Sequence, residues 1–175
     1  MINNNFKKIL KCLFTHINPN INALNIIGLD GAKIIEQSGD SYVLQYILQY
    51  LNTSLNTIIN SDGISSNVIA GVCIGFGAGS KQVSLEDYNL ETIISNLSYQ
   101  SSSVGTTEEG YTVITSAKNN TSTDIIVSEV GIFCRARSGQ GGQALPPFML
   151  TRNVLETPIT IKPNETKTFT VTINF

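Results

Sequence analysis

The residues most suggestive of chemistry lie between positions 67 and 91, in the run NVIAGVCIGFGAGSKQVSLEDYNLE. An apolar stretch leads into Gly75, Gly77 and Gly79, then Ser80-Lys81, and a Ser-Leu-Glu-Asp pattern typical of a helix N-cap follows. Strand, glycine loop and helix in this order are typical of phosphate-binding proteins. The spacing does not fit, because a Walker loop needs GxxxxGK[ST] and a dinucleotide site needs GxGxxG, whereas GFGAGS gives GxGxG and then serine. We therefore expect the glycines to allow a sharp exit from a buried strand, with backbone angles that residues bearing a Cβ avoid.

Metal binding and acid-base catalysis find equally little support in the sequence. The single histidine, His16, offers neither a second imidazole for a metal nor a nucleophile motif to serve. The carboxylate pairs Glu86-Asp87 and Glu108-Glu109 are adjacent in sequence, so their side chains should point in different directions and remain solvated. The sequence therefore predicts a protein that is not an enzyme and that carries no metal and no cofactor.

The amino-acid composition limits which classes of binding partner are expected. Charged residues make up 14% of the chain against about a quarter in ordinary domains, and the net charge is −2. Without a basic field, nucleic acid is not an expected partner. The N-terminal apolar run is short and interrupted by Lys11, and no long apolar stretch occurs, so we expect neither a signal peptide nor a membrane span. Cys12, Cys73 and Cys134 form no CxxC pair and are expected to be buried thiols in a reduced compartment.

The first third of the chain, residues 1–62, is predicted to be helical or mixed and to serve as an attachment or oligomerisation segment. Apolar residues recur at helical spacing near the N-terminus: Phe6, Ile9, Leu10, Leu13 and Phe14. We expect this stripe to dock on a partner subunit or on the chain's own β domain. Asp30-Gly31 predicts a hairpin turn, and residues 43–55 carry a second helical stripe.

Residues 63–175 have the texture of an antiparallel β domain. Strands are expected at 67–76, 110–119, 124–136 and 146–155, followed by a hairpin over 157–175 with its turn at Pro163-Asn164-Glu165. In the last strand, alternation directs one set of side chains inward: Phe169, Val171, Ile173 and Phe175. The predicted fold is mainly β, with an N-terminal helical segment and a C-terminal antiparallel β-sandwich or jelly-roll-like domain.

One charged residue lies inside an expected buried strand. Glu129 has apolar neighbours on both sides in VSEVGIF, so it needs a basic partner, which Arg135, Arg137 or Arg152 could supply. We predict a buried or interfacial contact between Glu129 and Arg152.

Several segments of the β domain together resemble a domain found in structural proteins of tailed bacteriophages, including fibre, decoration and tail-associated proteins of gut phages. EDYNLE at 86–91 matches a DDYxLE-like segment that follows a glycine-rich turn, and a polar strand region comes next. EVGIF at 129–133 matches an EIGLY-like strand, while LTRNVL at 150–155 and PITIKP at 158–163 match the strands that close the domain. The resemblance covers about residues 66–175. Asn153 replaces the usual aspartate, and Asn164-Glu165 replaces turn residues of Pro-Gly type.

The resemblance implies a non-enzymatic virion protein that is made and assembled in the bacterial host cytoplasm. Such a subunit would assemble with copies of itself and with other capsid, neck or tail proteins, as a head fibre, decoration or tail component. The residues proposed for subunit contacts are Phe6, Leu10, Leu13, Phe14, Glu129 and Arg152. Two exposed loops, 76–87 and 138–147, add contact candidates: Phe76, Lys81, Tyr88, Gln140 and Gln143.

A different class of function stays open beside this one. The same loops could bind a surface glycan, with Tyr88, Tyr99 or Tyr111 as the aromatic platform, although the chain has no tryptophan. An enzyme ranks last, since no catalytic set of residues is present.

Overall fold

The structure is a computed structural model that describes residues 4–15, 25–34, 51, 55, 70–107, 110–135 and 145–174. Within these residues the chain is mainly β, with one α-helix of 12 residues near the N-terminus. The elements in chain order are α1 (Asn4–Thr15), β1 (Gly71–Gly77), β2 (Leu97–Thr107), β3 (Gly110–Asn119), β4 (Ile125–Arg135), β5 (Phe148–Ile161) and β6 (Thr166–Asn174).

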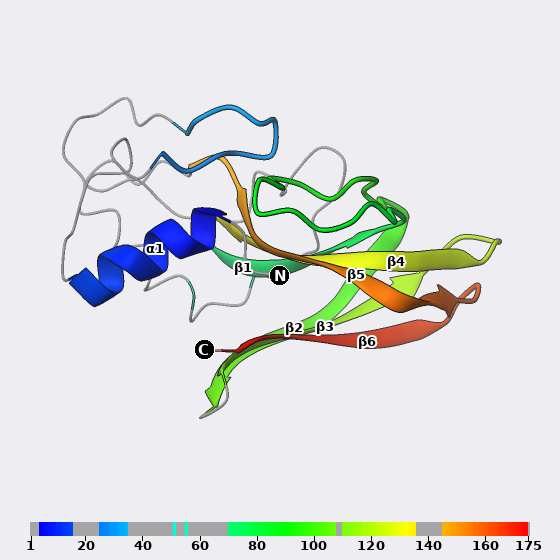
Figure 1. Cartoon of the computed structure of the whole chain (residues 1–175). Coiled ribbons are helices and arrows are strands. Elements are labelled where there is room, and N and C mark those ends of the chain that lie inside the picture. The colour runs from blue at the N-terminus through cyan, green and yellow to red at the C-terminus, as the bar shows by residue number, and fades with distance from the viewer. Residues whose placement is uncertain are drawn as a thin grey trace.

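The strands form two antiparallel sheets of three strands each, with orders β1-β4-β5 and β2-β3-β6. Figure 1 shows the two sheets as separate layers that face one another. The predicted mainly β fold with an antiparallel sandwich is confirmed, while the jelly-roll-like variant stays a prediction. No helix in the described part of the chain is long and apolar enough to cross a membrane.

A core of apolar side chains fills the space between the sheets, as the alternation in the last strand predicts. Phe169, Val171 and Ile173 of β6 are buried, while the threonine at 170 is exposed. The ring of Phe169 lies 4.7 Å from that of Phe76 in β1. Phe76 is fully buried in this core, so its prediction as a loop contact is wrong. The error came from its place beside a glycine loop, whereas its side chain belongs to the buried strand.

The opposite face of the β1-β4-β5 sheet is also covered. A second apolar cluster lies there, formed by Leu55, Cys73, Leu90, Phe133 and Met149. Residues 78–96, which we call the crossing loop, lie over this face on the side away from the other sheet (Figure 1). Every residue of β1 is therefore buried, as its nearly continuous apolar sequence predicts.

The cysteines of the β domain are buried, as expected. Cys73 lies in the second cluster and Cys134 in the core between the sheets. Burial raises the pKa of Cys73 to about 12, and it also raises the pKa of Cys134. Both thiols therefore stay protonated and unreactive at neutral pH.

Helix α1 packs on the chain's own sandwich, which is one of the two docking surfaces that the sequence left open. Phe6 and Ile9 are buried in the core cluster. The buried amide of Asn5 donates from Nδ2 to the carbonyl oxygens of Ile27 at 2.8 Å and Met149 at 3.3 Å, and its Oδ1 accepts from the amide of Ile27 at 2.9 Å. One side chain thus joins α1 to β5 and to the segment 25–34. The side chains of Leu10, Leu13 and Phe14 lie outside the described residues, and the division at residue 62 stays a prediction.

Two predicted turns are present, one of them in reduced form. The β5–β6 turn uses Pro163 and Asn164, and Asn164 adopts a left-handed φ of 63°. At Asp30-Gly31 the chain turns with φ of +78° at the glycine, but only one antiparallel bridge, between Ile27 and Lys33, forms beside it. The helical stripe at 43–55 falls outside the described residues apart from 51 and 55.

Strand β5 is longer than predicted. The sequence suggested two strands separated near Pro158, but residues 148–161 form one strand that pairs with β4 on both sides of that proline. Ile159 pairs with Val127 and Val154 pairs with Glu129, so residues 155–158 form a bulge opposite the single residue Ser128. Proline is tolerated here because a bulge on an edge strand requires no amide donor at that position.

A buried asparagine joins the ends of the two sheets. Asn119 donates from Nδ2 to the carbonyls of Thr123 at 2.7 Å and Ile161 at 2.8 Å, and its Oδ1 accepts from the amide and hydroxyl of Thr121. Its backbone carbonyl accepts from the amide of Asn164 at 2.8 Å. This one residue therefore fixes the β3–β4 connection against the β5–β6 turn.

Candidate functional site

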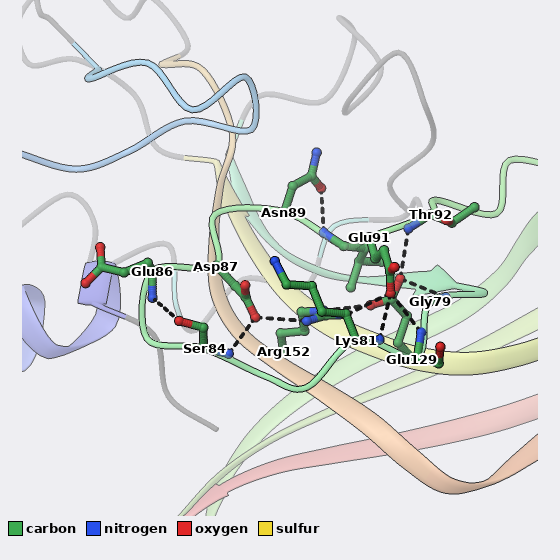
Figure 2. Close-up of polar contacts among 12 residues, drawn as sticks. Gly79, Lys81, Ser84, Glu86, Asp87, Asn89, Glu91, Thr92, Glu129 and Arg152 are labelled. Carbon is green, nitrogen blue, oxygen red and sulfur yellow. Dashed lines mark hydrogen bonds and ion pairs between the residues drawn. The ribbon is translucent and has the colours of Figure 1, made fainter.

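The most concentrated group of charges in the described residues surrounds Arg152 on the covered face of β5. The side chain of Arg152 is 2% exposed. Its Nε donates to Glu129 Oε2 at 2.7 Å and its Nη1 donates to Asp87 Oδ2 at 2.9 Å. Its Nη2 lies 3.7 Å from Glu91 Oε2. Figure 2 shows the three carboxylates arriving from the crossing loop and from β4. The predicted contact between Glu129 and Arg152 is confirmed, and it is buried.

Glu129 is fully buried but well compensated. Besides the guanidinium at Oε2, its Oε1 accepts from the backbone amides of Gly79 at 3.1 Å and Thr92 at 3.0 Å. Next to it along β4, the Ser128 hydroxyl donates to the carbonyl of Gly79 at 2.7 Å. Gly79 and Thr92 lie near the two ends of the crossing loop, so one carboxylate forms hydrogen bonds to both ends (Figure 2).

The glycines of the opening motif make room for this carboxylate. A Cβ built on Gly77 would stand 2.5 Å from Glu129 Cγ, and one on Gly79 would stand 2.5 Å from Glu91 Cβ and 2.6 Å from Glu129 Oε1. Neither glycine has a positive φ. The expected reason for these glycines, unusual backbone angles, is therefore wrong at both positions. They are required because the carboxylates approach the backbone too closely for any side chain.

The second half of the motif folds as a turn rather than as the helix that its cap pattern indicates. The amide of Ser84 donates to Asp87 Oδ2 at 2.8 Å, and the amide of Asp87 donates to the carbonyl of Ser84 at 3.2 Å. Glu91 Oε2 accepts from the amides of Ser80 and Lys81, each at 2.8 Å. The side chains that would have capped a helix instead close short loops of their own backbone.

These contacts change the proton affinity of two groups. Hydrogen bonds from the amides of Lys81 and Ser80 lower the pKa of Glu91 below its usual value, with a smaller contribution from the charge of Arg152. For Arg152, burial alone would lower the pKa, but the hydrogen bonds to Glu129 and Asp87 outweigh burial and raise it. The guanidinium therefore stays charged and serves as a permanent counterion for the carboxylates.

The acidic pair Glu86-Asp87 diverges as predicted, yet its expected solvation is wrong for Asp87. Glu86 Oε1 accepts from Asn4 Nδ2 at 2.7 Å at the start of α1, whereas the side chain of Asp87 is 12% exposed and paired with Arg152. The backbone amide of Asn4 also donates to the carbonyl of Leu85 at 3.0 Å. The crossing loop thus supports both the N-terminus of the helix and the ion-pair cluster.

An open cavity of about 360 Å³ adjoins the cluster on the crossing loop, and its lining includes Lys81, Tyr88, Asn89, Glu91 and Arg152. Tyr88 is 43% exposed, and its ring covers Gly31. Within the described ranges, no group of three or more His, Cys, Asp or Glu side chains is arranged to hold a metal ion. The carboxylates that face the cavity already accept hydrogen bonds from the chain itself, so the arrangement is suited to holding the loop in place.

The other predicted site residues are distributed as follows. Phe6, Glu129 and Arg152 contact residues of the same chain, and their role between subunits stays a prediction. Lys81 and Tyr88 are exposed on the crossing loop. Tyr111 is buried, with its hydroxyl donating to the carbonyl of Leu51, so its prediction as an aromatic platform is wrong.

Four predicted positions fall outside the described residues: His16, Arg137, Gln140 and Gln143. Residues 108 and 109, the second acidic pair, do so as well. Asp87 and Glu91 are the members of the cluster that sequence reasoning did not connect with Arg152. A charged residue inside an apolar strand was the sequence feature that identified Glu129. That feature does not reveal partners of Arg152 in a loop 61 to 65 residues away in sequence.

Comparisons of the chain with protein-family models, with curated proteins and with solved structures found no match.

Proposed function

We propose that this chain is a non-enzymatic structural subunit of a tailed-phage virion. It would assemble with itself and with other capsid, neck or tail proteins, as a head fibre, decoration or tail component. The observation that carries the proposal is the meeting at Arg152 of the three segments through which the sequence resembles phage structural domains.

Each of these segments contributes a different part of one cluster. EDYNLE supplies Asp87 and Glu91, EVGIF supplies Glu129, and LTRNVL supplies Arg152. The resemblance therefore falls on residues that act together physically, although they lie up to 65 residues apart in the chain. This coincidence supports the reading of the three segments as one domain signature.

The chemistry of the cluster supports a holding role. Its carboxylates accept backbone amides and a guanidinium, which fixes the crossing loop on the sheet. A catalytic carboxylate needs a face turned to substrate and a pKa matched to proton transfer, whereas the pKa of Glu91 is lowered, away from neutral pH. A loop fixed in this way offers a rigid surface to neighbouring subunits.

The proposal predicts that the protein is a component of phage particles. Antibody raised against the purified chain should label particles in electron micrographs, and mass spectrometry of gradient-purified particles should recover its peptides at a copy number typical of a symmetric component. Light scattering of the purified chain would give its mass in solution. A stable monomer that particles never contain would overturn the proposal.

The cavity beside Tyr88 favours glycan binding as a second candidate. Its volume suffices for a small ligand, and an exposed tyrosine ring with Asn89 and Lys81 nearby offers one stacking surface and polar groups. A glycan array should then give a signal that Tyr88→Ala removes and Tyr99→Ala, on the neighbouring strand β2, retains. An array without signal for the unsubstituted chain would eliminate this candidate.

A further inference from the structure

Within the described residues, strand β2 is the edge of the sandwich that stays open for pairing. In the order β2-β3-β6 it pairs with β3 on one side only, and no other described strand pairs with it. An edge strand presents a row of backbone amides and carbonyls that another strand can complete. Each of the other three edge strands carries a backbone contact, a proline or a charge that hinders the addition of another strand, as described next.

The two edges of the β1-β4-β5 sheet are closed by the chain itself. Along β1, the carbonyls of Val72 and Phe76 accept from backbone amides of residues 55 and 94, each at 2.8 Å, and Gly77 forms a bridge with Ile93. On β5, the Met149 carbonyl accepts from the amide side chain of residue 5, and Pro158 further along lacks a donor. Neither edge offers a continuous row of backbone groups.

Strand β6, the other edge of the β2-β3-β6 sheet, carries a charge. Lys167 is paired in register with Ala117 and therefore lies on the core-facing side of its strand, where it forms an ion pair with Glu165 at 2.8 Å. The Lys167 side chain is 42% exposed. A charge on an edge strand acts against strand addition, because docking another strand at this end of β6 would desolvate it.

Strand β2 has none of these devices over most of its length. Its sequence, LSYQSSSVGTT, contains no charged residue and no proline. One irregularity interrupts the pairing between Tyr99 and Ser101, and from Ser101 to Thr107 the register with β3 is continuous. Ser101, Ser103 and Gly105 lie exposed on the outer face, and a Cβ on Gly105 would meet nothing within 4 Å.

We propose that β2 pairs with β2 of a second copy of this chain, antiparallel about a two-fold axis over residues 101–105. This inference builds on the proposed role as an assembling subunit and names its partner. The pairing would join two three-stranded sheets into one continuous sheet of six strands. In an isologous contact the same surface meets itself, and β2 suits that arrangement because it brings no charge against its own copy.

The neighbouring surface supports a second copy as the occupant rather than a partner of opposite charge. Opposite residues 101–105, the outer face of β3 consists of hydroxyl and apolar side chains, those of Thr112, Ile114 and Ser116. Lys118, the next residue on this face, lies beyond the stretch, opposite Ser98. Threonines continue on β6, where the hydroxyl of Thr172 lies 3.2 Å from that of Thr112 on β3. When two such faces lie edge to edge, backbone hydrogen bonds hold the copies together and no like charges repel one another.

Cysteine substitutions test the contact directly. Opposite residues in antiparallel pairs have Cα atoms about 4.5 to 5.5 Å apart, within the span of a disulfide. Ser101→Cys, Ser103→Cys and Gly105→Cys, alone and in pairwise mixtures, cover every two-fold register over this stretch. We expect one of these combinations to form a crosslinked dimer under mild oxidation. The unsubstituted chain controls for the native cysteines, and Thr170→Cys on the same face of β6 controls for random collision.

A charge substitution provides the second readout. Ser103→Lys should weaken self-association by up to about fivefold, because it sets like charges close together across the pair, while Thr170→Lys should leave it unchanged. Sedimentation velocity of the purified chains measures both. No crosslink at any of the three positions, or equal crosslinking at position 170, would overturn the proposal.

Particle incorporation separates this inference from the function on which it builds. If the chain enters particles but β2 forms no crosslink, β2 self-pairing is wrong and the structural role stands. If the chain crosslinks through β2 but is absent from particles, the self-pairing stands and the virion role fails. A monomer whose entry into particles is lost with Ser103→Lys would assign this edge to another virion protein and overturn self-pairing.

Discussion

Replacing Arg152 by methionine removes the guanidinium that contacts all three carboxylates and retains a linear apolar side chain. Glu129 would keep two backbone amide donors but lose the guanidinium in a position with no solvent access. Asp87, largely buried, would lose the same partner. Two charged side chains would then face a common space without this guanidinium.

The expected cost follows from the burial of each pair. Breaking a buried ion pair by removing one partner costs about 3 to 5 kcal/mol, and the Glu129 pair belongs to that class. The Glu91 contact is longer, and its carboxylate is 41% exposed, so solvent screens it and it adds little to this cost. We therefore expect Arg152→Met to lower the free energy of unfolding by about 4 kcal/mol. That is a large share of the roughly 5 to 15 kcal/mol typical of a folded domain.

Urea unfolding followed by circular dichroism at pH 7 measures this loss. With a slope of about 2 kcal/mol per molar urea, the midpoint should fall by about 2 M. Arg135→Met is the matched control, because Arg135 is half-buried on the adjacent strand β4. It should cost less than about 1 kcal/mol. Adding Glu129→Leu to Arg152→Met should recover part of the loss by removing the stranded charge. If Arg152→Met and Arg135→Met cost the same, the cluster is not what holds the crossing loop.

Three further outcomes test other parts of the fold. Gly79→Ala should destabilise the protein by about 2 kcal/mol or more, because the new Cβ overlaps two carboxylate side chains, while Gly105→Ala, which meets nothing within 4 Å, should be neutral or slightly stabilising in thermal denaturation. Asn119→Ala should cost about 3 kcal/mol by orphaning buried carbonyls and an amide, whereas Asn120→Ala, an exposed neighbour, should cost less than about 0.5 kcal/mol. Because the pKa of Glu91 is lowered on folding from its ordinary 4.5, its stabilising effect is complete above that value and is lost as pH falls through the lowered pKa. Unfolding between pH 5 and pH 2 should therefore show a shallower loss of stability for Glu91→Gln than for the unsubstituted chain, and equal slopes would contradict the role assigned to its amide contacts.

Sequence reasoning reached the parts of the fold that depend on local pattern. The alternation of β6 predicted which side chains enter the core, because a strand has a period of two residues and one face of this sheet is buried. The charge of Glu129 inside an apolar strand predicted its partner, since a buried carboxylate requires a counterion.

The local sequence could not predict the features that depend on contacts between distant residues. Gly77 and Gly79 have backbone angles open to any residue, and only the approach of Glu129 explains them. The cap pattern at residues 84–87 fits a helix locally, but the chain turns there and Asp87 also pairs with Arg152, 65 residues away. Pro158 looks like the end of a strand until the bulge beside β4 is known. In each case a residue far along the chain selects among conformations that the local sequence permits.

The amide of Asn5 joins two points of the chain that are 144 residues apart, since it reaches the Met149 carbonyl. A 12-residue helix is marginal on its own, so α1 has to wait for β5 before it can dock. At about 5 to 20 residues per second, ribosomal synthesis of the intervening chain takes roughly 7 to 30 s. During that interval Phe6 and Ile9, later buried, lack the surface that covers them. Helix α1 is therefore made well before the strand that secures it, and its apolar side chains stay uncovered by β5 throughout that interval.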